Sequence, residues 1–273
     1  MRRSDGTSPL FRAAPTLWRP ACGSPGGAAN AWIASAQLAA AECNMLRCIV
    51  ARVLLFDVNE TLLDLQVLDP VFERAFGDAS VRQQWFGLVL RNAMALTITG
   101  DYEDFIAVGA ASLDMVARQR GVAIRDEARR AIRETMGNLP AHDDVVENLQ
   151  RLHRAGFRMA ALTNSPLDAA KRQLGNAGLA PLLDPIMSVE ATGQFKPAAP
   201  TYRDAAAMLG VSTSQIRMVA AHDWDIAGAM GAGCAGAYLL RPGMVLNPLF
   251  PAPDIVEADF HRLADRIIEV EMG

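Results

Sequence analysis

Residues 49–64 of the chain read IVARVLLFDVNETLLD. The first eight, 49–56, are mostly β-branched or aliphatic, which is typical of a strand buried inside a parallel sheet. Asp57 follows this strand directly, and Thr61 lies four residues further on. A carboxylate at such a strand end faces the crevice in which α/β sheets bind ligands, and it can act there as a covalent nucleophile. The alternative is that Asp57 only caps the following loop or helix.

Two different patterns follow this strand. Residues 66–140 show helical spacing of apolar residues, at 81–99 and 102–119, and a charged helical pattern at 125–136. From residue 141 strands and helices alternate, with strands predicted at 157–162, 186–189, 216–220 and 235–240 and helices at 142–155, 167–177, 198–209, 225–231 and 258–270. Alternation of this kind predicts an α/β fold with a doubly wound, Rossmann-like parallel sheet. We therefore expect a core made of 46–66 and 141–273, with 67–140 inserted as a helical cap.

Residues 1–44 differ from the rest of the chain in composition. They carry four arginines against two acidic residues and are rich in proline and glycine. A secretory signal is not expected, because no continuous apolar segment follows the basic residues. The composition fits a transit peptide, but we favour a disordered extension or a true start at Met45, and we leave 1–44 out of the fold prediction.

The bulk composition limits the classes of function. The 273 residues carry a formal net charge of −4, so no basic footprint for nucleic acid is present. No apolar run reaches the roughly 18 residues of a membrane span. The four cysteines, Cys22, Cys43, Cys48 and Cys234, fit neither a zinc site nor a disulfide framework, which predicts reduced thiols and a cytoplasmic protein. The expected partner is a small molecule held by a local site.

Polar residues follow the other predicted strands. Thr163 and Asn164 come after the strand at 157–162, Lys196 lies in the loop sequence QFKP, and Asp225 opens a helix. These groups also have plain structural explanations, since Thr163 and Asn164 can cap a helix, Lys196 can be a solvated lysine and Asp225 can be an N-cap. Because the strands are parallel, we expect their carboxyl ends to bring these side chains together.

Taken in order, the motif DxxxT at 57–61, Thr163-Asn164, Lys196-Pro197 and the segment DIAGAMGAG at 225–233 resemble the haloacid dehalogenase-like superfamily. The resemblance covers roughly residues 49–245, including the cap. Most members of this superfamily are magnesium-dependent phosphatases, with a second aspartate two residues after the nucleophile as general acid. This chain has Asn59 there, which cannot deliver a proton. A further acid that helps phosphatases hold the metal is missing from 219–222.

The chain therefore more closely resembles the type II, or L-2-haloacid, dehalogenases. The resemblance implies that an (S)-2-haloacid and water give a 2-hydroxy acid and halide through an ester on Asp57, with no metal or cofactor. It further implies catalytic roles for Asp57, Thr61, Lys196 and Asp225. Residues expected to bind substrate or halide are Arg91 from the first cap helix, Thr163, Asn164, Tyr202, Asn59, His222 and Trp224.

Several positions depart from the family pattern. Many members have Tyr-Gly where this chain has Asn59-Glu60, and Ser and Asn where it has Ala220 and His222. His222 is either a polar group near the reacting centre, even a base for the hydrolytic water, or a structural histidine.

Three alternatives stay open at this point. A magnesium-dependent phosphatase would need Asp223 or Glu60 to replace the missing acids. A non-catalytic relative would have kept only the fold. The resemblance also allows a homodimer.

Overall fold

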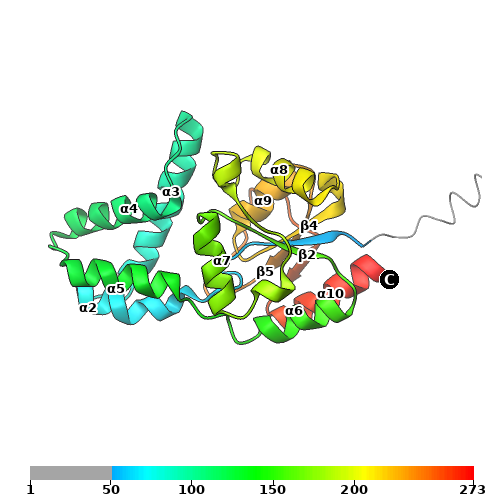
Figure 1. Ribbon diagram of the computed structural model, residues 1–273, viewed down its shortest axis with the longest axis horizontal. Coiled ribbons are helices and arrows are strands. Elements are labelled where there is room, and N and C mark those ends of the chain that lie inside the picture. The colour runs from blue at the N-terminus through cyan, green and yellow to red at the C-terminus, as the bar shows by residue number, and fades with distance from the viewer. Residues whose placement is uncertain (1–50) are drawn as a thin grey trace, which may run out of the picture. The chain divides into compact units, whose positions relative to one another are not determined.

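The computed structural model describes residues 51–273 (Figure 1). The predictions for residues 1–44, for the first two residues of the strand at 49–56 and for Cys22, Cys43 and Cys48 lie outside the described residues. No helix among residues 51–273 is long and apolar enough to cross a membrane.

One sheet of six parallel strands forms the centre of the fold, in the order β3-β2-β1-β4-β5-β6. The strands are β1 (Val53–Phe56), β2 (Met159–Thr163), β3 (Ile186–Ser188), β4 (Ile216–Ala220), β5 (Ala235–Leu239) and β6 (Ile255–Glu257). All four residues of β1 are buried, as expected for a central strand. The chain runs outward from β1 to β3 and then returns to place β4 on the other side of β1. This switch point is where such sheets open a crevice at their carboxyl ends.

Helices cover both faces of the sheet. Helices α6 (Val145–Arg154) and α10 (Phe260–Met272) pack together on one face, and α8 (Ala199–Leu209) and α9 (Asp223–Gly231) pack together on the other (Figure 1). Helix α7 (Leu167–Asn176) packs beside β3. Together with the cap helices described next, this arrangement confirms the predicted doubly wound α/β fold with a helical cap. Short 3-10 helices connect the elements at Leu65–Leu68, Ala180–Leu182, Val189–Ala191 and Thr213–Gln215.

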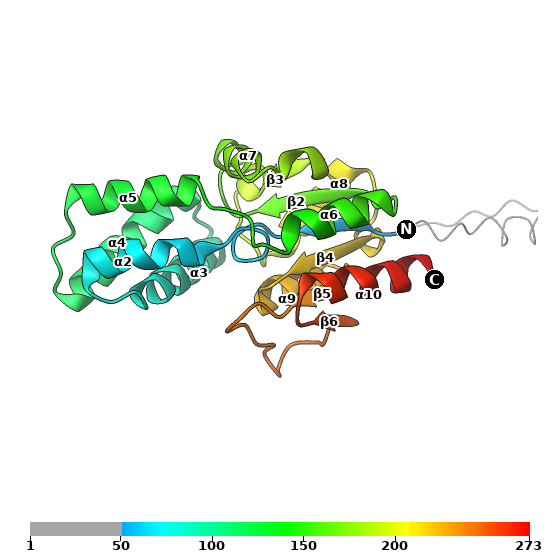
Figure 2. The same ribbon diagram turned by 90° about the horizontal axis from the view of Figure 1, so that it is seen from below.

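Four helices lie between β1 and α6 in the sequence and group together beyond one end of the sheet (Figure 2). They are α2 (Asp69–Phe76), α3 (Val81–Thr99), α4 (Phe105–Arg120) and α5 (Asp126–Gly137). Trp85 packs on Phe72 with ring centroids 5.2 Å apart, so this group has an apolar interior of its own. Gly100 ends α3 in the left-handed conformation, and Asp104 accepts hydrogen bonds from the first backbone N–H groups of α4. The four helices fall within 67–140, and the division of the chain at those residues stays a prediction.

The predicted elements differ from the structure mainly at their ends. The strands at 216–220 and 235–240 and the helix at 81–99 agree with the structure to within one residue. Helix α9 begins at Asp223, two residues before the predicted start. Strand β6 was not predicted, because it has only three residues and directly follows a segment rich in proline, a residue that is rare in strands.

Candidate active site

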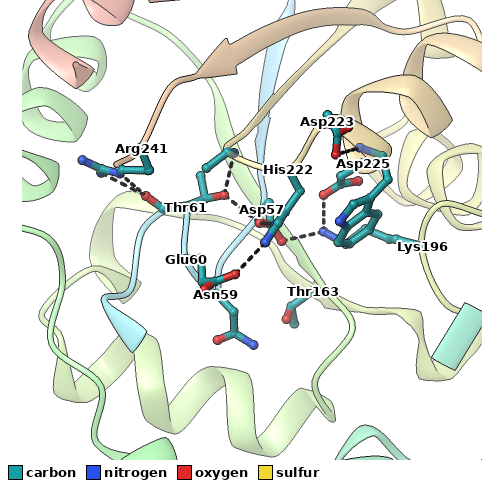
Figure 3. Close-up of polar contacts among 12 residues, drawn as sticks. Asp57, Asn59, Glu60, Thr61, Thr163, Lys196, His222, Asp223, Asp225 and Arg241 are labelled. Carbon is teal, nitrogen blue, oxygen red and sulfur yellow. Dashed lines mark hydrogen bonds and ion pairs between the residues drawn. The ribbon is translucent and has the colours of Figure 1, made fainter. Parts of the chain in front are cut away.

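Asp57 lies at the carboxyl end of β1, with 4% of its surface exposed, and its backbone N–H donates to the carbonyl of Val219 in β4. Its two carboxylate oxygens have different partners (Figure 3). Oδ1 accepts a hydrogen bond from Lys196 Nζ at 2.7 Å. Oδ2 accepts one from Thr61 Oγ1 at 2.6 Å and lies 3.0 Å from His222 Nδ1. The carboxylate is thus held from two sides by separate groups of residues.

Lys196 is the centre of the Oδ1 side. Its ammonium group is buried and donates to Asp57 Oδ1, to Asp225 Oδ2 at 2.6 Å and to the Leu162 carbonyl at 3.0 Å. An ammonium group has three protons, so all of its donors are used. Asp225 is fully buried, and its other oxygen accepts from the Tyr202 hydroxyl at 2.6 Å. We call Lys196, Asp225 and Tyr202 the lysine side of the site.

Two local features place Lys196. Its backbone N–H donates to Asn164 Oδ1 at 2.9 Å, which ties the QFKP loop to the end of β2. The loop also packs closely on α9 at Gly228, where an added Cβ would lie 2.4 Å from Pro197 Cβ. Only glycine permits such an approach, so Gly228 allows Lys196 to reach Asp225 of the same helix.

Thr61 anchors the Oδ2 side. Its hydroxyl donates to Asp57 and accepts from the backbone N–H of Ala221 at 2.9 Å. Its carbonyl accepts from the guanidinium of Arg241, at 3.0 Å from Nη2, and Nη1 of Arg241 contacts both carboxylate oxygens of Asp144 at 2.8 Å. Hydrogen bonds thus hold both the side-chain hydroxyl and the backbone carbonyl of Thr61, and this keeps the hydroxyl directed at Asp57 Oδ2.

His222 links two carboxylates. Its Nδ1 faces Asp57 Oδ2, and its Nε2 lies 3.0 Å from Glu60 Oε2 (Figure 3). An ionised carboxylate only accepts hydrogen bonds, so both ring nitrogens carry a proton and His222 is an imidazolium. Glu60 in turn accepts from Arg82 Nη1 at 3.3 Å, and Arg82 is a buried residue of the cap helix α3. We call Glu60, His222 and Arg82 the histidine side of the site.

The ionisation states follow from burial and from these pairs. Burial opposes the charge of Asp57, but Lys196 and His222 outweigh it and lower the pKa of the Asp57 carboxyl far below its usual range. Burial also opposes the charge of His222, yet its hydrogen bonds to Asp57 and Glu60 raise its pKa to about 10. The pKa of Lys196 is raised by the two aspartates despite its burial. At neutral pH Asp57 is therefore a carboxylate, with Lys196 and His222 both cationic.

Two cavities flank the ring of Phe86. One, of about 360 Å³, is lined by Phe86, Glu60, Arg82, His222, Trp224 and Arg241, among others. The other, of about 290 Å³, is mainly apolar and lies among α3, α4, α5 and the start of α7, with Ser165 and Phe86 in its wall. Within residues 51–273, no group of three or more His, Cys, Asp or Glu side chains is arranged to hold a metal ion.

The structure gathers most of the residues predicted for the site. Asp57, Thr61, Lys196, Asp225, Tyr202 and His222 form one hydrogen-bonded cluster, and Trp224 stacks on His222 with ring centroids 4.9 Å apart. Thr163, Asn164 and Asn59 lie beside the cluster. The Thr163 hydroxyl accepts from the N–H of Ser165, and the Asn59 amide donates to Ser165 Oγ at 3.4 Å. The polar groups of Thr163 and Asn164 thus bind nearby backbone.

The structure does not bring Arg91 to this cluster. Its side chain is exposed and donates to Asn92 Oδ1. The arginine of the same helix that reaches the site is Arg82, nine residues earlier. Nine residues correspond to two and a half helical turns, so the two arginines lie on opposite faces of α3. A signal for Arg82 was present in the sequence, because Phe86 and Val89, four and seven residues further on, mark the buried face.

Sequence reasoning also missed the pairing of Glu60 with His222 and the part played by Arg241. Glu60 adopts a positive φ of 61°, a conformation that the sequence gives no reason to expect at a glutamate. Arg241 lies just after β5, and its contact with Thr61 joins residues 180 positions apart. Neither contact has a local signature.

A parallel sheet with a buried, ionised carboxylate at its switch point, covered by a helical cap, defines an α/β enzyme of the aspartate-dependent class. The model of the haloacid dehalogenase-like hydrolases matches residues 51–233, and the chain belongs to this family. A relative, (S)-2-haloacid dehalogenase 1 of Pseudomonas sp. (strain CBS-3), is 28% identical over 72% of this chain and 86% of its own length. The (S)-2-haloacid dehalogenase of Xanthobacter autotrophicus is 26% identical over 70% of this chain and 75% of its own.

Solved structures show the same fold. The structure of L-2-haloacid dehalogenase from Xanthobacter autotrophicus with chloropropionic acid covalently bound superposes with a TM-score of 0.74, at 21% identity. The match covers 82% of this chain and all of that one.

Proposed function

We propose that the protein is an (S)-2-haloacid dehalogenase, which converts a small 2-haloacid and water into a 2-hydroxy acid and halide. The observation that carries the proposal is the state of Asp57, a buried carboxylate kept ionised by Lys196 and His222. A carboxylate that has lost its water shell but kept its charge is suited to nucleophilic attack on carbon. The names of the relatives described above support the same reaction.

The two oxygens of Asp57 differ in their ability to attack. Oδ2 accepts from both Thr61 and His222, whereas Oδ1 accepts from Lys196 alone. Oδ1 therefore keeps a free lone pair, and we assign it as the attacking atom. It bonds to C2 of the haloacid while the carbon–halogen bond breaks, and the halogen leaves with the electron pair. The carbon is inverted, and an ester on Asp57 results.

Water then attacks the Asp57 carboxyl carbon, and the bond from that carbon to Oδ1 breaks. The product hydroxyl keeps Oδ1, and the water oxygen replaces it in Asp57. Of the two protons of the water, one ends on the product hydroxyl and the other is released to solvent. Halide is stable at neutral pH and needs no proton, which suits Asn59 at the position where a phosphatase has its general acid. The reaction as proposed needs no metal or cofactor.

The cavity beside the histidine side is the proposed route by which the substrate reaches Asp57 and the halide leaves, since its wall includes Glu60 and His222 but not Asp57 itself. Arg82 supplies a buried guanidinium there, paired with Asp69 through Nε and with Glu60 through Nη1, and we transfer to Arg82 the halide-binding role expected of Arg91. Trp224 and Phe86 provide apolar walls. Asn164 and Tyr202 act in this proposal by holding Lys196 and Asp225 in place. Action in the cytoplasm is proposed from the cysteine pattern, and a homodimer from the family resemblance alone.

The test is halide release from racemic 2-chloropropionate and from fluoroacetate in the presence of EDTA, with an aryl phosphate plus magnesium as the parallel assay. The proposal predicts release of halide in EDTA and consumption of one enantiomer of 2-chloropropionate. Asp57→Asn should lower the rate at least about a thousandfold, because the amide is no longer a nucleophile. Phosphate release that requires magnesium, with no halide from either acid, would overturn the proposal in favour of a phosphatase.

A further inference from the structure

The histidine side contains a residue in an uncommon backbone conformation. Glu60 is the one non-glycine residue with a positive φ among residues 51–273. Glycine adopts this conformation without strain, whereas glutamate does so at a cost. An outlier held in place by its surroundings suggests a function for the side chain. The Glu60 carboxylate is held at both oxygens, by Arg82 at Oε1 and by His222 at Oε2.

The second observation concerns the hydrogen-bond donors that face Asp57 Oδ2 once the ester has formed. If Oδ1 becomes the ester oxygen, Oδ2 becomes the carbonyl oxygen. Two donors already point at it, the Thr61 hydroxyl at 2.6 Å and His222 Nδ1 at 3.0 Å. When water adds to the ester, negative charge develops on this carbonyl oxygen. Donors that are aimed in advance at such an oxygen are the usual means of stabilising the transition state of acyl transfer.

We propose that His222 is a catalytic residue of ester hydrolysis, donating Nδ1–H as an imidazolium to Asp57 Oδ2 together with the Thr61 hydroxyl. Glu60, anchored by Arg82 of the cap, is the positioning residue that keeps the second ring nitrogen protonated. The inference rests on the proposed function, because it assigns a role within the same two-step reaction. His222 keeps both of its protons throughout, so the proton balance of hydrolysis is unchanged.

The role of Glu60 follows from the charge change at Asp57. The carboxylate of Asp57 stabilises the imidazolium in the free enzyme, but this charge disappears when the ester forms. His222 then retains one carboxylate partner, Glu60, with Arg82 beyond it. Without Glu60 the ring would lose its charge at the step in which a charged donor is worth most, since charged donors form stronger hydrogen bonds than neutral ones.

The surroundings of His222 agree with a charged ring held in one orientation. Trp224 of α9 stacks on the ring at 4.9 Å, and Phe86 of α3 lies 6.5 Å away, both measured between ring centroids. The charged neighbours are Asp57 and Glu60 in direct contact, Lys196 beyond Asp57, Arg82 with its other partner Asp69 beyond Glu60, Asp223 next in sequence, and Arg241 in the wall of the same cavity. The ring of His142 bonds the Glu60 carbonyl. The His222 ring is thus packed against aromatic side chains, and its two nitrogens contact carboxylates.

The experiment is rapid mixing of the enzyme with 2-chloropropionate, following halide release and the intact mass of the protein. His222→Ala should leave the first stoichiometric release of halide within about tenfold of wild type, since Oδ1 keeps its lone pair and Lys196. Ester hydrolysis should slow by about a hundredfold to a thousandfold, the usual effect of losing one such donor. The protein should therefore accumulate with the mass of the bound acyl group.

Two matched variants separate catalysis from structure. His222→Asn keeps an N–H close to Nδ1 without the charge, so hydrolysis should slow less than in His222→Ala. Deprotonation of His222 should lower kcat at alkaline pH. Glu60→Gln keeps the contact to His222 but removes the negative charge that stabilises the imidazolium, so this decrease in kcat should begin at lower pH. Tyr102→Phe serves as a control for folding, because the Tyr102 hydroxyl has no hydrogen-bond partner among the described residues.

The outcomes are distinct. If His222→Ala or His222→Asn slows halide release and hydrolysis equally, with no accumulated ester, the assignment of His222 is overturned and the proposed function stands. If the wild type releases no halide at all, both the proposed function and this inference are overturned. If Glu60→Gln leaves the pH profile of kcat in place, the positioning role of Glu60 is overturned.

Discussion

The lysine side and the histidine side hold the two oxygens of the same carboxylate, but they are built differently. Lys196, Asp225 and Tyr202 come from the core alone, and a single ammonium group satisfies both aspartates. The histidine side joins the core to the cap, because Arg82 of α3 contacts Glu60. Lys196 and His222 both keep Asp57 ionised, but only the histidine side depends on where the cap helix α3 lies. Single substitutions can therefore remove the lysine side or the histidine side separately.

The largest effect is expected from breaking the lysine side. Lys196→Met leaves the buried carboxylate of Asp225 without a counter-charge and that of Asp57 with His222 alone. Activity should fall at least about a thousandfold, and the free energy of unfolding should fall by about 3–5 kcal/mol, as when one partner of a buried ion pair is removed. Halide assays and denaturant unfolding measure the two effects.

The chain offers a matched control for this variant, because its sequence contains only two lysines. The other, Lys171, is exposed on α7. Lys171→Met should leave both activity and stability within experimental scatter. A Lys196→Met protein with normal stability would contradict the buried triad of Asp57, Lys196 and Asp225.

The lysine side can be predicted from the sequence more readily than the histidine side, because the histidine side depends on contacts between the core and the cap. Lys196 and Asp225 stand at strand ends next to recognisable turns and helix starts, so local pattern and the geometry of parallel strands were enough to bring them to Asp57. The partner of Glu60 depends on how a helix 22 residues away packs over the sheet. That packing is a tertiary property, so the sequence predicts the helix at 81–99 but gives no direct sign that Arg82 of this helix contacts Glu60.

The next effect concerns the two arginines of α3. Arg82→Ala removes a buried charge from the cavity and a contact to Glu60, so kcat/KM for 2-chloropropionate should fall by about a hundredfold, in the range for buried charged contacts. Arg91→Ala should change it by less than about twofold, since the side chain is exposed. If Arg91→Ala lowered kcat/KM more than Arg82→Ala does, the face of α3 that carries Arg91 would be the one directed at the site.

A smaller effect is expected from moving Lys196 without replacing it. Gly228→Ala would set a Cβ 2.4 Å from Pro197 Cβ and 2.6 Å from its carbonyl oxygen, which forces the QFKP loop away from α9. Displacement of a catalytic group by about 1 Å can cost on the order of a hundredfold in rate, so a loss of about ten- to a hundredfold in kcat is expected. Gly231→Ala is the control, because nothing lies within 4 Å of its added Cβ.

The smallest effect is the dependence of stability on pH. The pKa of His222 is raised from 6.5 to about 10 by Asp57 and Glu60, against its burial. Its contribution to stability is therefore complete below pH 6.5 and is lost as the pH rises towards 10. Asp57, with a lowered pKa, stays ionised across this range and contributes no change there.

Denaturant unfolding of the wild type should therefore show stability falling as the pH rises from 7 towards 10. His222→Asn has no titrating ring and should show a flatter profile over the same interval. Identical profiles for the two proteins would mean that His222 is neutral in the folded state, and the imidazolium would have to be abandoned.

The most direct test of the central claim, that Asp57 forms an ester through one of its own oxygens, is a single turnover in water enriched in oxygen-18. Enzyme in excess over 2-chloropropionate is allowed to react once, and the product and the peptide containing Asp57 are analysed by mass spectrometry. Attack by Asp57 should leave ordinary oxygen in the hydroxyl group of the product and place oxygen-18 in Asp57. Oxygen-18 in the product, with Asp57 unlabelled, would show that water attacks the haloacid directly and would contradict the account.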